Sequence, residues 1–143
     1  MPGVPETLVD AVVAHLDAAT FSQTFTPAKK LVPIFERDQL SGWDVSVHAG
    51  SSQREKQAKS GVQLKTYSVG VVVRYPADTD QAGLETRAGA FIQLCEEIKD
   101  SLATPNMGNL VPVEVEQDLP FDLDRVSSAG VFFAQLTFRY KGI

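Results

Sequence analysis

The feature that most constrains this fold is the stretch of residues 43–75, in which two strand-like segments flank a polar, basic loop. The first segment, residues 43–47, alternates apolar and polar side chains. The second runs over residues 62–75, far beyond the usual strand of about 5 to 6 residues. Two such segments predict a β-hairpin whose distal part, about residues 48–66, protrudes from the domain as an arm.

The apolar phase of the second segment changes along its length. Side chains alternate between the two faces of a strand, so Val62 and Leu64 lie on one face and the apolar residues of 67–75 lie on the other. The chain's own core can cover only one of these faces. Either a β-bulge resets the phase, or the Val62 end buries its apolar face against another subunit.

The loop at the tip is basic, whereas the whole chain has a net charge of −5. An acidic chain argues against a nucleic-acid binder that neutralises phosphates over its whole surface. A solvated loop tip is the simplest interpretation, and docking to an acidic neighbour is the alternative. Residues 50–61 have a net charge of +2, from Arg54, Lys56 and Lys59 against Glu55.

Length and composition predict one domain over residues 1–143. The chain is 43% hydrophobic, and a domain of this size buries roughly 68 to 70% of its unfolded surface. The single cysteine, Cys95, excludes an internal disulfide, and its place in an apolar helical stripe favours core packing over a nucleophilic role. The first basic residue is Lys29, and no apolar run approaches the roughly 20 residues of a membrane span, which predicts a soluble, non-exported protein with no membrane partner.

The predicted elements follow the order α-β-β-β-α-β-β, an α+β fold with an antiparallel or mixed sheet. Pro5 and Glu6 begin an N-terminal amphipathic helix. Pro27 and Pro33 interrupt residues 24–35, which therefore form an edge or irregular strand. We expect this strand to form an antiparallel unit with the two segments of the hairpin.

One long helix and two strands complete the domain. Asp80 is the predicted N-cap of the helix, and apolar residues spaced three and four apart form one seam along it. Pro112 assigns the next strand to a sheet edge, and strict alternation over residues 132–140 indicates a half-buried strand. The seam consists of Leu84, Ala88, Phe91, Cys95, Ile98 and Leu102.

No residue pattern predicts catalysis, a cofactor or a metal. His15 and His48 have no ligand partner at metal-site spacing, and we interpret both as ordinary surface residues. The chain has no phosphate-binding glycine loop and no nucleophile elbow, and Ala82 occupies a ligand position of the one segment similar to a calcium loop. An acidic run favours a solvated or partner-facing edge over paired catalytic carboxylates; it comprises Glu114, Glu116, Asp118, Asp122 and Asp124.

The arrangement resembles the tail-terminator and neck proteins, which join head to tail, of long-tailed bacteriophages. The resemblance covers nearly the whole chain. It rests on element order, length and local patterns that include Val32-Pro-Ile-Phe-Glu36, the strand at residues 43–47 and Ser52-Gln-Arg54 in the loop. In that family a small α+β subunit assembles into a ring, typically a hexamer, that caps the tail tube and joins it to head-completion proteins.

The resemblance implies a non-enzymatic virion protein of the tail or neck, assembled in the host cytoplasm. Its partners would be copies of itself, the major tail-tube protein and head-completion proteins, with DNA passing through the lumen without sequence-specific binding. Residues 50–65 would be the arm. The acidic segment 114–124 matches no pattern of that family, and the interpretation of Glu114, Glu116 and Asp118 as a partner-facing edge rests on the acidic residues alone. The interface residues of the arm would be Arg54, Glu55, Lys56, Lys59, Val62, Leu64 and Lys65.

Three alternatives stay open. Another head- or tail-completion protein of the neck would share ring symmetry but bind a different neighbour. A monomeric cytoplasmic binding module would use the basic loop to hold an acidic ligand or nucleic acid. An acid-base hydrolase would depend on Glu114, Glu116 or Asp122 and is the weakest of the three.

Overall fold

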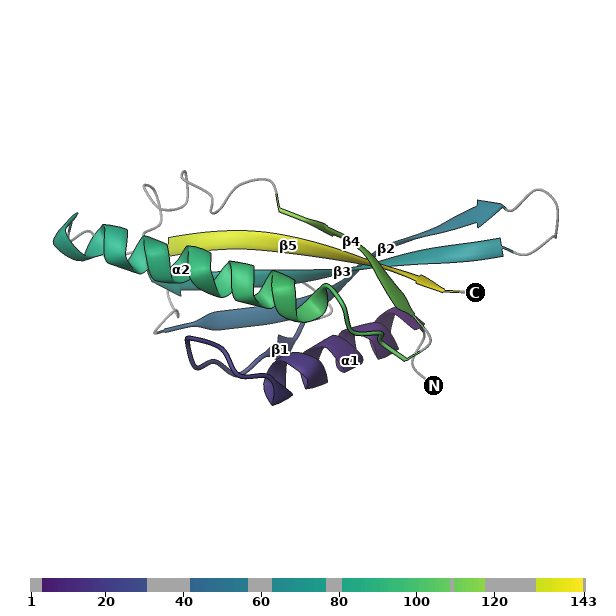
Figure 1. Cartoon of the computed structure of the whole chain (residues 1–143), viewed down its shortest axis with the longest axis horizontal. Coiled ribbons are helices and arrows are strands. Elements are labelled where there is room, and N and C mark those ends of the chain that lie inside the picture. Colours follow the sequence, from purple (N-terminus) through teal and green to yellow (C-terminus); the bar gives the residue numbers. More distant parts are fainter. Residues whose placement is uncertain are drawn as a thin grey trace.

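The computed structural model describes residues 4–30, 42–56, 63–76, 81–108, 110–117 and 131–142. Its element order is the predicted α-β-β-β-α-β-β, which confirms the α+β fold (Figure 1). The elements are α1 (Val4–Ala18), β1 (Ala28–Lys29), β2 (Asp44–Lys56), β3 (Gln63–Pro76), α2 (Gln81–Leu102), β4 (Val111–Glu116) and β5 (Val131–Gly142).

The strands form one mixed sheet in the order β1-β2-β3-β5-β4. The predicted antiparallel unit is wrong for its first member, because β1 pairs with β2 in parallel, with Ala28 opposite Ser46. The other pairs are antiparallel. Both proline-marked strands lie at sheet edges as predicted: β1 directly follows Pro27, and β4 contains Pro112. The predicted N-cap Asp80 lies outside the described residues.

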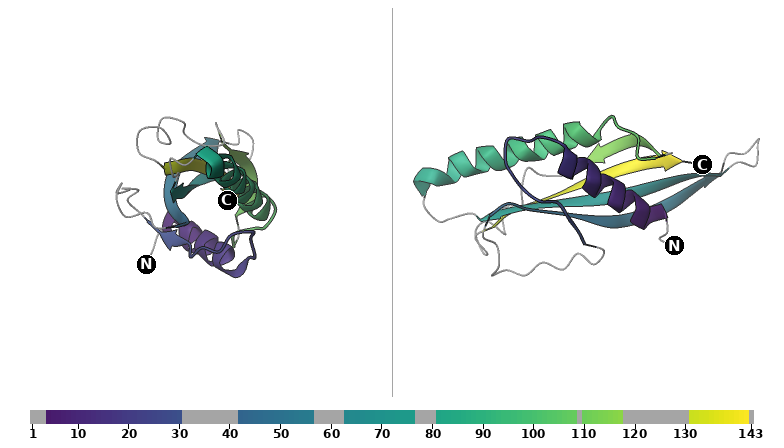
Figure 2. Two further views of the ribbon diagram at one scale, coloured as in Figure 1. Left: turned by 90° about the vertical axis from the view of Figure 1, so that its left-hand side faces the viewer. Right: turned by 90° about the horizontal axis from the view of Figure 1, so that it is seen from below.

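The core lies between the two helices and one face of the sheet (Figure 2). Every second residue of β5 from Phe132 to Tyr140 is buried, as its alternation predicts. In β3, Tyr67, Val69, Val71 and Val73 face the core as predicted, but the residues between them are buried as well. The predicted seam of α2 is confirmed, with Leu84 and Ala88 half-buried at its N-terminal end. The buried residues of the two helices are Leu8, Val9, Val12, Leu16, Phe91, Leu94, Cys95, Ile98 and Leu102.

Hydrogen bonds join α1 and the segment that follows it to α2 beside this core. The Nε2 atom of His15 lies 3.0 Å from Ser101 Oγ and 3.1 Å from the Ser101 carbonyl oxygen. Glu97 accepts hydrogen bonds at Oε1 from the Ser22 amide at 2.9 Å and from the Ser22 hydroxyl at 2.7 Å. These contacts fix the segment after α1 against the C-terminal half of α2.

The structure corrects the predicted extent of the first hairpin strand. Residues 50–56 were assigned to a loop, but β2 continues through Lys56, which pairs with Gln63 of β3. The long β3 needs partners for its backbone amides and carbonyls, and extending β2 supplies them regardless of side-chain polarity. Polar composition alone therefore gave a strand that was too short.

A bulge is present in the hairpin, but in β2 and not in β3. Ala49 pairs with Val69 and Ser52 pairs with Tyr67, so β2 has one extra residue between these pairs. The register of β3 with β5 is unbroken from Lys65 to Pro76. The bulge therefore does not reset the apolar phase of β3 over those residues.

Candidate subunit interface

The distal end of the β2–β3 hairpin extends beyond the rest of the sheet. The last row with three strands joins Arg54, Lys65 and Gly142. The next rows pair Glu55 with Leu64 and Lys56 with Gln63, and no strand among the described residues lies beside them as a third member. Figure 1 shows this end projecting past β5 and both helices. The sheet thus narrows to two strands at the basic end of the hairpin.

Among the residues whose side chains the structure describes, Tyr67, which is 8% exposed, is the member of the core cluster nearest to this projection. The Lys65 ammonium group lies 5.5 Å from the Tyr67 ring centroid, a cation–π contact at the edge of the core. An isolated two-stranded hairpin is marginally stable in water. Contacts with a partner would therefore stabilise the rows beyond Lys65.

The edge strand β4 exposes apolar side chains at the opposite side of the sheet. Val111 is 51% exposed and Val113 is 58% exposed. The register of β4 with β5 shifts between Pro112 and Glu114, so Val113 lies at a bulge. A proline and a bulge are devices that protect an edge from indiscriminate strand pairing. A partner on this edge would therefore contact side chains more readily than extend the sheet.

The acidic residues of β4 share one arginine on β5. Arg139 Nη1 lies 3.0 Å from Glu114 Oε2 and 2.8 Å from Glu116 Oε1. The hydrogen bond from Arg139 lowers the pKa of Glu116, so this carboxylate stays ionised at neutral pH. Two carboxylates and one guanidinium leave a charge of −1 on this partly exposed group. We call Val111, Val113, Glu114 and Glu116 the β4 patch.

The structure does not bring the two predicted sets of interface residues together within one subunit. The strands β2 and β4 are separated by β3 and β5 in the sheet. At about 4.8 Å between neighbouring strands, the hairpin edge lies roughly 14 Å from β4. Arg54, Glu55, Lys56, Leu64 and Lys65 belong to the hairpin strands. Lys59, Val62, Asp118, Asp122 and Asp124 lie outside the described residues.

A buried polar cluster on the sheet face opposite the helices was missed by the sequence analysis. Ser46, His48, Ser68 and Arg74 are at most 9% exposed. Arg74 donates two hydrogen bonds to Asp44 Oδ2, from Nε at 2.8 Å and from Nη2 at 2.6 Å. Alternation placed these residues away from the apolar core but gave no sign that this face is buried.

The interpretation of both histidines as ordinary surface residues is wrong for His48. This residue is 9% exposed, and its Nδ1 lies 3.2 Å from the Ala49 carbonyl oxygen. His15 is half-buried and bonded to Ser101. Gly70, which lies directly opposite His48 in the register, leaves room for the imidazole. A glycine within a valine-rich strand was the one sequence signal of this close approach.

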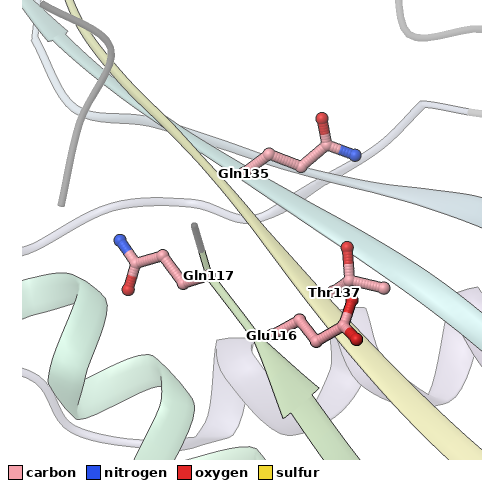
Figure 3. A pocket seen from close by; sticks show the side chains of 4 residues that line it. All are labelled: Glu116, Gln117, Gln135 and Thr137. Carbon is pink, nitrogen blue, oxygen red and sulfur yellow. The ribbon is translucent and has the colours of Figure 1, made fainter. Parts of the chain in front are cut away.

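An open pocket of about 250 Å³ lies beside the β4–β5 pair. Figure 3 shows four described residues that line it, Glu116, Gln117, Gln135 and Thr137. Glu116 is the one ionisable residue among these four, so they offer neither a nucleophile with a base nor a pair of carboxylates. Within the described residues, no group of three potential metal ligands occurs.

Comparison with known proteins adds no relative. No family model matches the chain, and no similar protein is found among the curated proteins. Within the described parts of the chain, neither helix combines the length and apolar character that crossing a membrane requires. The features that bear on function are therefore the projecting hairpin end and the β4 patch.

Proposed function

We propose that this protein is a non-enzymatic structural subunit that forms a ring at the head-to-tail joint of a long-tailed bacteriophage, where it terminates the tail tube. Its partners are copies of itself, the major tail-tube protein and the head-completion proteins of the neck. The protein acts in the virion by shape and by buried contact surface, and DNA passes through the ring without sequence-specific binding.

The observation that carries this proposal is the hairpin end that projects beyond the sheet. Its two-stranded rows past Lys65 have no third strand beside them among the described elements. A hairpin of this kind gains stability when a neighbour covers it. The resemblance in element order to tail-terminator and neck proteins supports the same conclusion.

The test shortens the hairpin where the sheet narrows. Replacing residues 55–64 with Asn-Gly joins Arg54 to Lys65, which are opposite each other in the register, through a two-residue turn. We expect a folded monomer. Its far-ultraviolet circular dichroism should still show the signal of the two helices, which this change does not touch. Wild-type protein should form rings in electron micrographs, alone or with purified tail tubes, whereas the shortened variant should form none.

A matched control separates the loss of the hairpin end from a general defect. Inserting Gly-Ser between residues 57 and 60 keeps every residue of β2 and β3 as the structure describes these strands, so this variant should still assemble. Wild-type protein that stays monomeric at micromolar concentration, both alone and with tail tubes, would contradict the proposed function. Normal ring formation by the shortened variant would show that the hairpin end is not the joint.

A further inference from the structure

We infer that the pocket beside the β4–β5 pair takes the guanidinium group of an arginine that a neighbouring protein presents. The pocket lies on the sheet face opposite the helices, because Gln135 and Thr137 alternate along β5 with residues that are buried in the core. Recognition of an arginine goes beyond the proposed ring function, which assigns no chemistry to this face of the sheet.

The pocket has the size of a site for one side chain. Its volume is about 250 Å³, which is below the roughly 300 to 1,000 Å³ of pockets that hold drug-sized ligands. It is open to solvent, so a group carried by another molecule can enter it from outside. These dimensions favour a side chain that reaches in from a partner over a free cofactor.

The hydrogen-bond acceptors of the pocket are spread over two strands. Glu116 and Thr137 lie opposite each other in the register of β4 with β5, so their Cβ atoms are about 4.5 to 5.5 Å apart. Gln135 lies two residues from Thr137 on the same face of β5, with its Cα atom about 7 Å away. Figure 3 shows Glu116 and Thr137 close together, with Gln117 and Gln135 around them.

The charge beside the pocket favours a cation. Glu116 Oε1 and Glu114 Oε2 lie 2.8 and 3.0 Å from the same nitrogen, Arg139 Nη1. One guanidinium group therefore serves two carboxylates, and like charges held this close repel each other. The Glu116 side chain is 49% exposed and lines the pocket, so it remains accessible to a second cation. A cation in the pocket would reduce the repulsion, whereas an anion would increase it.

Hydrogen-bond geometry favours arginine over lysine as the source of this cation. A guanidinium group has five N–H donors in a rigid planar fork, whereas an ammonium group is a compact charge with three donors. The fork can donate to the Glu116 carboxylate and at the same time to the Thr137 hydroxyl or a glutamine carbonyl oxygen. An ammonium group placed at Glu116 would reach fewer of these separated acceptors.

The direct test is a titration of the purified protein with N-acetyl-arginine amide, followed through backbone amide chemical shifts by NMR. The control ligands are N-acetyl-citrulline amide, which has nearly the same shape without the charge, and N-acetyl-lysine amide. We expect saturable shifts at Gln117, Gln135 and Thr137 with the arginine derivative, with a Kd of about 1 to 10 mM. The two control ligands should bind at least about fivefold more weakly.

Three variants assign the binding to the pocket. Glu116→Gln leaves Glu114 and Arg139 as a neutral pair and should weaken binding of the arginine derivative roughly tenfold. Gln135→Glu adds a carboxylate of nearly the same shape and should strengthen binding by a similar factor. Glu96→Gln removes an exposed carboxylate that pairs with Lys99 on α2, and should leave binding unchanged. All three changes are at exposed side chains, so circular dichroism should show the wild-type fold.

Assembly experiments then identify the protein that presents the arginine, and this step alone rests on the proposed ring function. Failure of Glu116→Gln to form rings by itself would assign the arginine to a neighbouring copy of this chain. Rings of Glu116→Gln that no longer bind purified tail tubes or head-completion proteins would assign it to that partner. The Glu96→Gln control should assemble and bind as the wild type does.

The outcomes separate this inference from the proposed function. Absence of saturable shifts with the arginine derivative up to about 100 mM, or equally strong binding of either control ligand, would overturn the inference. Unchanged affinity in both Glu116→Gln and Gln135→Glu would overturn it as well, as would wild-type behaviour of Glu116→Gln in every assembly experiment. Wild-type protein that binds the arginine derivative but never assembles would instead refute the ring function and leave the guanidinium site standing.

Discussion

Gly70→Ala should destabilise the protein through one contact across the β2–β3 pair. Gly70 lies opposite His48, and a Cβ atom built on Gly70 would lie 2.2 Å from His48 Nε2 and 2.4 Å from Cε1. Non-bonded heavy atoms prefer separations of about 3.5 Å or more. The imidazole would therefore have to move by roughly 1 Å or more, away from Gly70.

The cost depends on whether the ring has room to move. His48 is 9% exposed, so its imidazole is confined by neighbouring atoms on the buried polar face. Inserting a methyl group at such a site typically costs about 1 to 3 kcal/mol of unfolding free energy. For a domain of this size, each 1 kcal/mol lowers Tm by roughly 2 to 4 °C. We therefore expect a fall in Tm of about 2 to 12 °C.

The assays are thermal unfolding, which gives Tm, and urea unfolding, which gives the free energy, both followed by the fluorescence of Trp43, the only tryptophan. Its ring stacks on Tyr75 with centroids 4.2 Å apart, so unfolding changes its surroundings. Four proteins are compared: wild type, Gly70→Ala, His48→Ala and the double variant. Removing the imidazole removes the clash, so Gly70→Ala should be neutral or slightly stabilising in the His48→Ala background. The coupling free energy of this cycle should be about 1 to 3 kcal/mol.

Equal destabilisation by Gly70→Ala in both backgrounds would refute this reasoning. The methyl group would then conflict with something other than His48. A wild-type-like Tm for Gly70→Ala alone would show that the imidazole moves freely and that the close approach has no energetic consequence.

Two further predictions concern titratable groups of α2. Burial raises the pKa of the Cys95 thiol to about 12, so the native protein should react with a thiol reagent only as it unfolds. The free energy of unfolding should fall as pH rises from 9 towards 12, because the thiol of the unfolded chain loses its proton first. Cys95→Ala should abolish that part of the decline. Partial burial acts to raise the pKa of Glu97, but hydrogen bonds from Ser22 and Gln93 outweigh it and lower the pKa below 4.5. This stabilisation is present above pH 4.5 and disappears as pH falls through the lowered pKa. The urea midpoints of wild type and Glu97→Gln should therefore differ at neutral pH and converge as pH falls below that lowered pKa. Midpoints that stay equally far apart at every acidic pH would contradict the assignment.

Periodicity located the helices and the interior strands because one buried face leaves a strong signal. The alternation over residues 132–140 and the seam of α2 both match buried residues. Proline placed the two edges correctly, since a residue without an N–H cannot sit inside a ladder. Leu94 was missed from the seam because a helix packed on a sheet buries a face wider than one row of residues.

The candidate interface was only partly accessible from the sequence. Composition marked the basic hairpin end and the acidic edge, but it could not show that Arg139 binds both Glu114 and Glu116 across 25 and 23 positions. The strand character of residues 50–56 was hidden by their polarity, because backbone pairing does not depend on side-chain type. The bulge in β4 places Val115 opposite the buried Phe138 while Val111 lies opposite Lys141, and alternation alone does not reveal this difference.

The sequence by itself determined the order of elements, the face of each interior strand that enters the core, and the edge positions of the proline-bearing strands. These features are local, since they follow from residue spacing and from the missing amide of proline. Only the tertiary structure decided the parallel direction of β1, the burial of His48 and Arg74, and the row at which the sheet narrows to the hairpin alone. Each of these depends on which strand lies beside which and in what register, and that choice is made by contacts between residues far apart in the chain.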